Sequence, residues 1–185
     1  QTLNLTVGGS RPPFPTNILH TDFWGEIQMF RMWSHMTYVF GKKSKEILIK
    51  VKPNLQKVMN YAITVSSVDF GIVQGVRTIE QQRALVNSGA SQTLDSNHLR
   101  GEAVDTAAYV DGVLSWNDKL YDNIADAVKA AAIHENVGIR WGGAWNVPDI
   151  RVWKGTMQEA LEFYVASRKK LGKKPFMDLG HFELI

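Results

Sequence analysis

Residues 96–105 read SNHLRGEAVD, and residues 178–185, at the end of the chain, read DLGHFELI. Each stretch holds a histidine and a carboxylate at short spacing, with a glycine and an apolar β-type segment beside them. A catalytic zinc site needs three ligands drawn from His, Asp, Glu and Cys, and it leaves one position open for water. His98, Asp105 and His181 can supply these ligands. The spacing of the first two residues alone also fits a surface loop in which both side chains are merely solvated.

The wider pattern is more specific than this spacing. The pattern S-x-H-x-x-G-x-A-x-D, followed far downstream by D-x-x-H-F-E-L, resembles the LAS metallopeptidases. That family contains the VanX- and VanY-like D-alanyl-D-alanine peptidases and the phage endolysins that cut the L-alanyl-D-glutamate bond of peptidoglycan. Three further segments resemble the endolysin branch and occur in family order: residues 40–58, 69–82 and 140–145. The resemblance covers residues 37–185 and predicts a zinc peptidase domain there.

The periodicity of apolar residues predicts an α+β fold. Helical spacing alternates with short β-type segments, so we expect a small, mainly antiparallel sheet with helices packed on it and zinc at one edge. The family resemblance implies the hedgehog/D-Ala-D-Ala-peptidase-like form of this fold. The expected helices are 44–52, 54–66, 79–86, 119–135 and 156–171, and the expected strands are 70–76, 103–108, 137–141 and 181–184. Ser44 and Thr78 are expected to cap the helices that they precede.

The composition describes an ordinary globular domain. Hydrophobic residues make up 44% of the 185 residues and charged residues 21%, and the longest apolar runs are far too short to span a bilayer. The absence of cysteine excludes disulfides and thiolate ligands, so a zinc ion must be held by His and carboxylate. The net charge of +3 favours anionic partners. We expect a monomer that acts on bacterial peptidoglycan, with anionic outer-membrane lipid as a further partner. The sequence holds no basic patch interleaved with aromatic residues, so we do not expect nucleic acid as a partner.

Residues 1–36 form an N-terminal extension that reads differently from the rest. Ser34-His35-Met36 is typical of an expression-vector junction, which predicts that residues 1–35 are a fusion segment and that Met36 is the native start. The alternative is a natural arm that contacts the cell wall or the membrane. The extension lacks a charged n-region typical of a signal peptide. We therefore expect synthesis in the host cytoplasm and access to the wall after another protein has permeabilised the membrane.

The family resemblance implies roles for two further residues. Asp178 would accept the proton of the attacking water and then donate it to the leaving amine. Its shorter side chain, compared with glutamate, resembles the endolysin branch more than the VanX branch. Arg77 would stabilise the oxyanion or hold the substrate carbonyl. Without the resemblance, a salt bridge at a strand end would be the preferred interpretation of Arg77.

Other polar and aromatic residues are assigned weaker roles. Gln82 is expected to orient Arg77 or the loop, and it is grouped with Trp141 and Trp145 as a residue of the peptide groove. For the tryptophans beside Gly142-Gly143, packing in the core is the alternative. Strand alternation predicts that Glu102 points away from the metal, and that Glu183 shares the face of His181 and can support it from behind.

Basic residues gather where the helix over 156–171 is expected to end. They are Arg168, Lys169, Lys170, Lys173 and Lys174. Positive charge at a helix C-terminus complements the helix dipole, and it could also contact an anionic wall polymer or lipid.

Three functions fit these observations. The first is a zinc-dependent L-alanyl-D-glutamate endopeptidase, an endolysin. The second is a D-alanyl-D-alanine carboxypeptidase, which needs a pocket closed around a free C-terminus. The third is a zinc-stabilised wall-binding module without turnover, which would need neither Asp178 nor Arg77.

Overall fold

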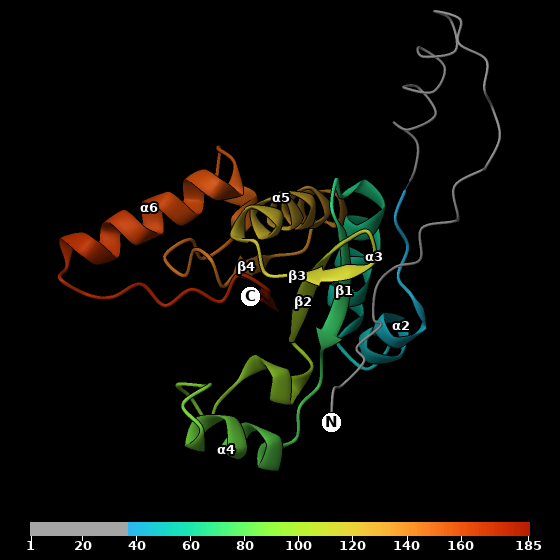
Figure 1. Ribbon diagram of the computed structural model, residues 1–185, viewed down its shortest axis with the longest axis horizontal. Coiled ribbons are helices and arrows are strands. Elements are labelled where there is room, and N and C mark those ends of the chain that lie inside the picture. Colours follow the sequence, from blue (N-terminus) through green and yellow to red (C-terminus); the bar gives the residue numbers. More distant parts are fainter. Residues whose placement is uncertain (1–36) are drawn as a thin grey trace, which may run out of the picture.

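A five-stranded antiparallel sheet organises the part of the chain that the computed structural model describes, residues 37–185 (Figure 1). The strands are β1 (Asp69–Gln74), β2 (Ala103–Val110), β3 (Val113–Ser115), β4 (Ile139–Trp141) and β5 (His181–Leu184). Their order is β1-β2-β5-β4, and the short β3 pairs with the end of β2. The expected α+β fold with a small antiparallel sheet is confirmed. Strand β3 is not among the strands expected from the sequence. Asp111 and Gly112 join it to β2 through a tight turn with positive φ at both residues.

Five α-helices accompany the sheet in the described residues. They are α2 (Lys42–Leu48), α3 (Pro53–Val65), α4 (Ile79–Asn87), α5 (Asp118–Glu135) and α6 (Met157–Lys170). Helices α3 and α5 pack against each other and lie along one face of the sheet, and α6 extends outward from α5 (Figure 1). Helix α4 stands apart beyond the end of β1. Two 3₁₀ helices, Asn97–Arg100 (η1) and Ile150–Val152 (η2), complete the elements.

The two faces of the sheet carry side chains of different polarity, because side chains alternate along each strand. On the helix-covered face, successive strands place apolar side chains in the core: Phe70, Ile72, Val104, Ile139, Trp141 and Phe182. Side chains at the intervening positions of a strand point to the opposite face. There β2 presents Asp105, β5 presents His181 and Glu183, and β4 presents Arg140. The open face of the sheet therefore collects the polar groups of the predicted site.

The capping predictions had different outcomes. Thr78 caps α4 as expected, because its hydroxyl accepts a hydrogen bond from the backbone N–H of Gln81 in a capping box. The prediction that Ser44 is an N-cap is wrong. Helix α2 begins at Lys42, and Ser44 lies inside it, where its buried hydroxyl accepts a hydrogen bond of 3.0 Å from the N–H of Ile72. Residues 1–36, with the predicted vector junction, lie outside the described part of the chain.

Candidate metal centre

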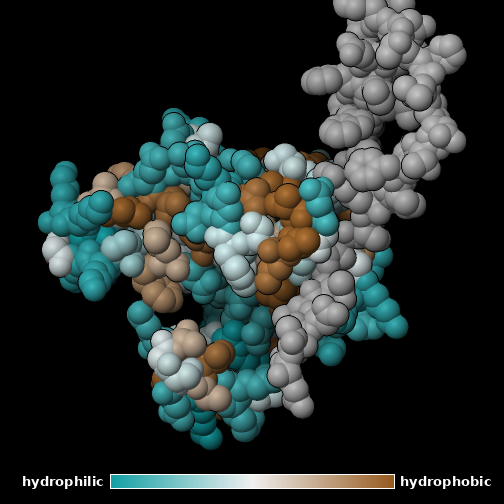
Figure 2. All heavy atoms as spheres, in the orientation of Figure 1, coloured by the Kyte–Doolittle hydropathy of each residue, from teal (hydrophilic) through white to brown (hydrophobic). Residues whose placement is uncertain are grey.

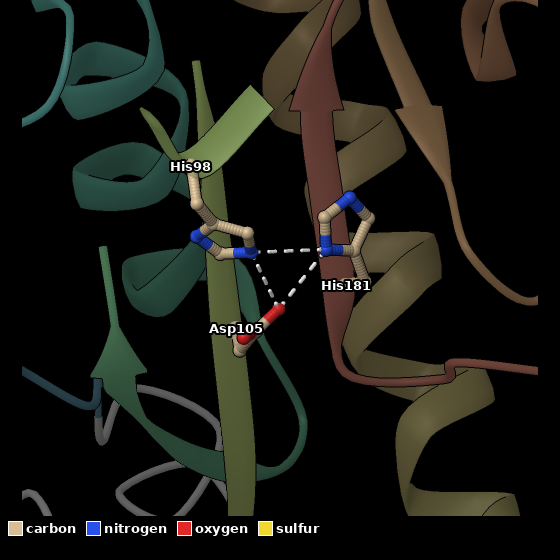
Figure 3. Close-up of side chains that lie close together, drawn as sticks. All are labelled: His98, Asp105 and His181. Carbon is tan, nitrogen blue, oxygen red and sulfur yellow. Dashed lines mark hydrogen bonds and ion pairs between the residues drawn. The ribbon is translucent and has the colours of Figure 1, made fainter. Parts of the chain in front are cut away.

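Three side chains from separate segments converge on the open face of the sheet (Figure 3). His98 comes from η1, whose tight exit is made by Gly101 in the left-handed conformation. Asp105 on β2 lies directly opposite His181 on β5 in the sheet register. The structure thus brings the three predicted ligands together, although 83 positions separate the two histidines in the sequence.

The ligand atoms form a nearly equilateral triangle. His98 Nε2 lies 3.1 Å from Asp105 Oδ1 and 3.3 Å from His181 Nδ1, and His181 Nδ1 lies 3.0 Å from the same oxygen. Tetrahedral coordination with bonds of about 2.0–2.1 Å would separate ligand atoms by roughly 3.3–3.4 Å. The triangle therefore needs little adjustment to hold a small divalent cation.

Each histidine has its other ring nitrogen fixed by a second partner. His98 Nδ1 donates to the carbonyl of Gly75 at 2.7 Å, and His181 Nε2 donates to Glu183 Oε2 at 3.0 Å. With these nitrogens protonated, the lone pairs of both facing nitrogens point toward the carboxylate of Asp105. Three electron-rich atoms at this spacing repel one another unless a proton or a cation lies between them. The donor set therefore fits a metal, and the supporting role predicted for Glu183 has the geometry it requires.

Without a metal, the electrostatics favour a proton between the carboxylates and His181, at the place that a cation would take. Burial opposes ionisation of Asp105, but hydrogen bonds from His181 and His98 outweigh it and place the pKa of Asp105 well below its usual range. Burial also disfavours charge on His181, yet its bonds to Asp105 and Glu183 raise the pKa of His181 to about 9. The pKa of Glu183 falls to about 2, because bonds to His181 and Arg140 outweigh its burial. The pocket thus stabilises positive charge between two carboxylates.

Arg77 lies beside the ligands and is held from several sides. Its Nη1 donates to Gln82 Oε1 at 2.6 Å, and its Nη2 lies 3.4 Å from Asp105 Oδ2. Gln82 is completely buried and donates in turn to the carbonyl of Thr93 at 2.6 Å. Gln82 thus fixes one end of the Arg77 guanidinium against the loop that holds Thr93. The prediction that Gln82 lines the groove is wrong, because its side chain is buried and lines neither hollow. The Nε of Arg77 is buried without a hydrogen-bond partner among the described residues, so one donor stays free.

Asp178 stands at the edge of the same cleft. Desolvation and then the negative charge of Asp105 raise its pKa, while the nearby histidines and Arg77 oppose that rise. The backbone N–H of Asp178 donates to the carbonyl of Gly142, and any side chain at Gly142 would collide with the carbonyl of Asp178. This glycine therefore allows the segment that carries Asp178 to approach the sheet.

Two adjoining hollows meet at the centre. The larger, about 600 Å³, lies between the α4 lobe and the rest of the domain, where Figure 2 shows the surface hollowed. The smaller, about 420 Å³, lies toward α5. Asp105 and Asp178 line both hollows, so the cleft continues on either side of the predicted metal.

The two tryptophans predicted to line the groove are placed differently. Trp145 lines the larger hollow, 5.5 Å from the ring of His181. The prediction for Trp141 is wrong, because its side chain is fully buried in the core and its indole N–H donates to the carbonyl of Leu179. On β4 the side chain of Trp141 points toward the core, as that of Ile139 does, whereas the groove lies on the opposite face of the sheet.

Arg140 is the site residue that the sequence patterns did not single out. It lines the larger hollow, donates to Glu183 Oε1 at 2.6 Å and lies over the ring of Trp145 at 5.3 Å. The available signal was strand alternation, since Ile139 and Trp141 are strongly apolar and Arg140 between them must face the opposite side.

Comparison with known proteins agrees with this geometry. The family model described as phage L-alanyl-D-glutamate peptidase matches residues 36–159. The L-alanyl-D-glutamate peptidase of Escherichia phage T5 is 38% identical over 115 residues, which are 60% of this chain and 84% of that protein. The chain belongs to the phage L-alanyl-D-glutamate peptidase family.

Two further relatives of the family are similar to this chain. The L-alanyl-D-glutamate peptidase of Listeria phage A118 is 40% identical over 75 residues, which are 40% of this chain and 26% of that protein. The crystal structure of the L-Ala D-Glu endopeptidase ChiX of Serratia marcescens superposes with a TM-score of 0.61 at 34% identity, over 80% of this chain and 91% of that one. The family model ends before Asp178 and His181, and the geometry of β5 brings these residues to the part of the site that it does cover.

Proposed function

We propose that this phage-type peptidase is a zinc-dependent endopeptidase that hydrolyses the L-alanyl-D-glutamate bond in the stem peptides of peptidoglycan. One observation carries the proposal. A triangle of His98, Asp105 and His181 shares one cleft with a carboxylate and a guanidinium, in a member of this family. A site that only stabilised the fold would need neither of these two groups.

Zinc is the metal that fits the donors best. Two imidazole nitrogens and one carboxylate oxygen with a water at the fourth position form a common catalytic zinc set, whereas calcium and magnesium prefer ligands that are all oxygen. When bound, the ion would polarise the scissile carbonyl and acidify a water. His98, Asp105 and His181 would hold it, and Glu183 would keep His181 in the required tautomer.

Asp178 is proposed as the general base and then the general acid. Its raised pKa brings it nearer to the pH at which it works, which favours a group that must take up and release a proton in one cycle. It would take one proton from the attacking water. When the C–N bond breaks, the same proton would pass to the nitrogen that becomes the amine of D-glutamate.

Arg77 is proposed to stabilise the negative charge on the carbonyl oxygen. Its bonds to Gln82 and Asp105 fix the guanidinium before substrate arrives, so little reorganisation is needed during the reaction.

The shape of the cleft favours an endopeptidase over a D-alanyl-D-alanine carboxypeptidase. A carboxypeptidase closes its pocket around the last residue of its substrate. Here a hollow extends from Asp178 in two directions, so a peptide can continue past the scissile bond on both sides.

We also propose that the protein acts as a monomer at the cell wall once the membrane has been permeabilised. No helix in residues 37–185 is both long and apolar enough to cross a bilayer.

Anionic outer-membrane lipid would bind the basic end of α6, where the last turn holds Arg168, Lys169 and Lys170. Cosedimentation with anionic and neutral vesicles would test this contact.

Digestion of purified peptidoglycan, followed by mass spectrometry of the fragments, tests the proposed activity. The assay compares the wild type, the zinc-stripped protein before and after zinc is restored, and Asp178→Asn. We expect fragments that end at L-alanine together with fragments that begin at the amine of D-glutamate. They should disappear in the stripped protein and fall by about 10²–10⁴ in Asp178→Asn, which should still bind zinc. Release of D-alanine alone would identify a carboxypeptidase instead, and no cleavage with zinc tightly bound would leave a binding module.

A further inference from the structure

The smaller hollow differs in chemistry from the larger one. The side chains of Val73, Trp116 and Met177 line it and are exposed. Its only charged lining residues within the described part of the chain are Asp105, Asp118 and Asp178. Three arginines line the larger hollow, Arg77, Arg100 and Arg140, together with four carboxylates: Asp95, Asp105, Asp178 and Glu183. Guanidinium groups therefore line the cleft on one side of the predicted metal, and exposed apolar side chains without any basic group line it on the other.

The stem peptide has a matching asymmetry about the L-alanyl-D-glutamate bond. On the C-terminal side, the D-glutamate linked through its γ-carboxyl keeps a free α-carboxylate, and further carboxylates follow. On the N-terminal side, L-alanine joins the lactyl group of N-acetylmuramic acid, which is uncharged apart from its amides and hydroxyls. The acidic hollow would repel carboxylates, and the arginines would attract them.

Trp116 has the features of a platform for a sugar ring. Its indole is 69% exposed and stacks on the ring of Tyr121, with an interplanar angle of 5° and ring centroids 6.3 Å apart. Tyr121 is itself almost fully buried, and its hydroxyl donates to the carbonyl of Ser115 at 3.3 Å. The indole is thus supported on a rigid base while most of it faces solvent. The electron-rich face of an indole attracts the polarised C–H groups of a pyranose ring.

We propose that the hollow between Trp116 and Asp178 binds the N-acetylmuramyl-L-alanine side of the substrate, with the sugar stacked on Trp116. The anionic D-glutamate side then extends into the arginine-lined hollow. This inference rests on the proposed endopeptidase function and adds the direction in which the substrate lies. It makes Trp116 a residue that recognises glycan-linked peptides in preference to free ones.

Two substrates that differ only in the sugar test the proposal kinetically. One is a disaccharide-peptide released from peptidoglycan, and the other is the same peptide with an N-acetyl group on L-alanine, which keeps the amide and removes the sugar. Trp116→Ala should lower kcat/KM for the sugar-bearing substrate about tenfold more than for the acetylated peptide, as expected for the loss of one stacked ring. Trp116→Tyr should recover part of that preference. Phe163→Ala removes an exposed aromatic that lies outside both hollows and should not change the preference.

A binding measurement separates this proposal from the activity itself. In ¹⁵N-labelled protein, the indole N–H signal of Trp116 is the one that disappears in Trp116→Tyr, and it should shift when disaccharide-L-alanine, the expected product, is added. If the wild type cleaves neither substrate, the endopeptidase function is refuted, and the shift of the Trp116 signal still tests the sugar site. An unmoved Trp116 signal would overturn the sugar site, as would equal losses of kcat/KM on both substrates in Trp116→Ala.

Discussion

Glu183 offers the sharpest test of how the site prepares His181 for a metal. Its Oε2 accepts a hydrogen bond of 3.0 Å from the N–H of His181 Nε2, and its side chain is only 6% exposed. The negative charge keeps that nitrogen protonated, makes the facing Nδ1 more basic and fixes the plane of the ring. Glu183→Gln preserves the size of the side chain and an acceptor oxygen but removes the charge.

The expected loss of zinc affinity follows from the role of Glu183, which would act on the metal only through His181. Removal of the partner of a ligating histidine typically weakens metal affinity by about 10–100-fold. That range corresponds to roughly 1.4–2.7 kcal/mol of binding free energy. Arg140 also loses its ion pair with Glu183, but the Arg140 side chain is 39% exposed and water can solvate it, so this adds little. We therefore expect zinc binding to weaken by one to two orders of magnitude while the fold is retained.

Competition with a chromophoric chelator would measure the zinc affinity, and thermal melting of the zinc-free proteins would check the fold. Glu102→Gln is the matched control. Glu102 lies one residue before β2 and bonds to Lys52 and Arg100, away from the metal ligands. It should bind zinc as the wild type does. Wild-type affinity in Glu183→Gln, or an equal loss in Glu102→Gln, would refute the argument that Glu183 acts through His181.

Three further predictions concern pH, catalysis and stability. The pKa of His181 is raised to about 9 without metal, so its contribution to the free energy of unfolding is complete below pH 6.5 and is lost as pH rises through 9. Thermal melts of the zinc-free protein should show this fall, saturating zinc should suppress it, and a flat profile would contradict it. Arg77→Lys should lower kcat by about 10²–10³, because lysine cannot reproduce the fork of donors that a guanidinium offers. Its zinc affinity should stay nearly unchanged, and a parallel loss of zinc binding would indicate a structural role. Ser44→Ala leaves the amide of Ile72 unpaired and should cost about 1–3 kcal/mol in urea denaturation without a change in kcat, whereas exposed Ser88→Ala should cost far less.

Local sequence identified much of the site because strand geometry is regular. The period of two along a strand predicts that Glu183 shares the face of His181 and that Glu102 points away from the metal. In the structure Glu183 bonds to His181, and Glu102 bonds to Lys52 and Arg100. The contact between Asp105 and His181 depends instead on the register between β2 and β5, which the sequence does not state locally. There the family resemblance supplied the link that periodicity could not.

The errors arose where tertiary contacts outweigh local preference. Ser44 has the residue type of an N-cap, but the packing of α2 against β1 uses its hydroxyl for the amide of Ile72. An aromatic residue beside two glycines can face either side of a sheet, and Trp141 faces the core. Strand β3 is three residues long, too short to show a period, although the preceding Asp111-Gly112 is a strong hairpin signal.

Strand β5 makes the fold and the site inseparable. It pairs with β2 on one side and β4 on the other, so it completes the middle of the sheet and buries Phe182 in the core. Its alternate residues, His181 and Glu183, face the predicted metal centre. Arg140 then connects Glu183 to Trp145 on the groove wall, so a substrate that contacts this wall also touches the residues that orient a metal ligand. Substrate binding and metal geometry should therefore be coupled through the same strand pair.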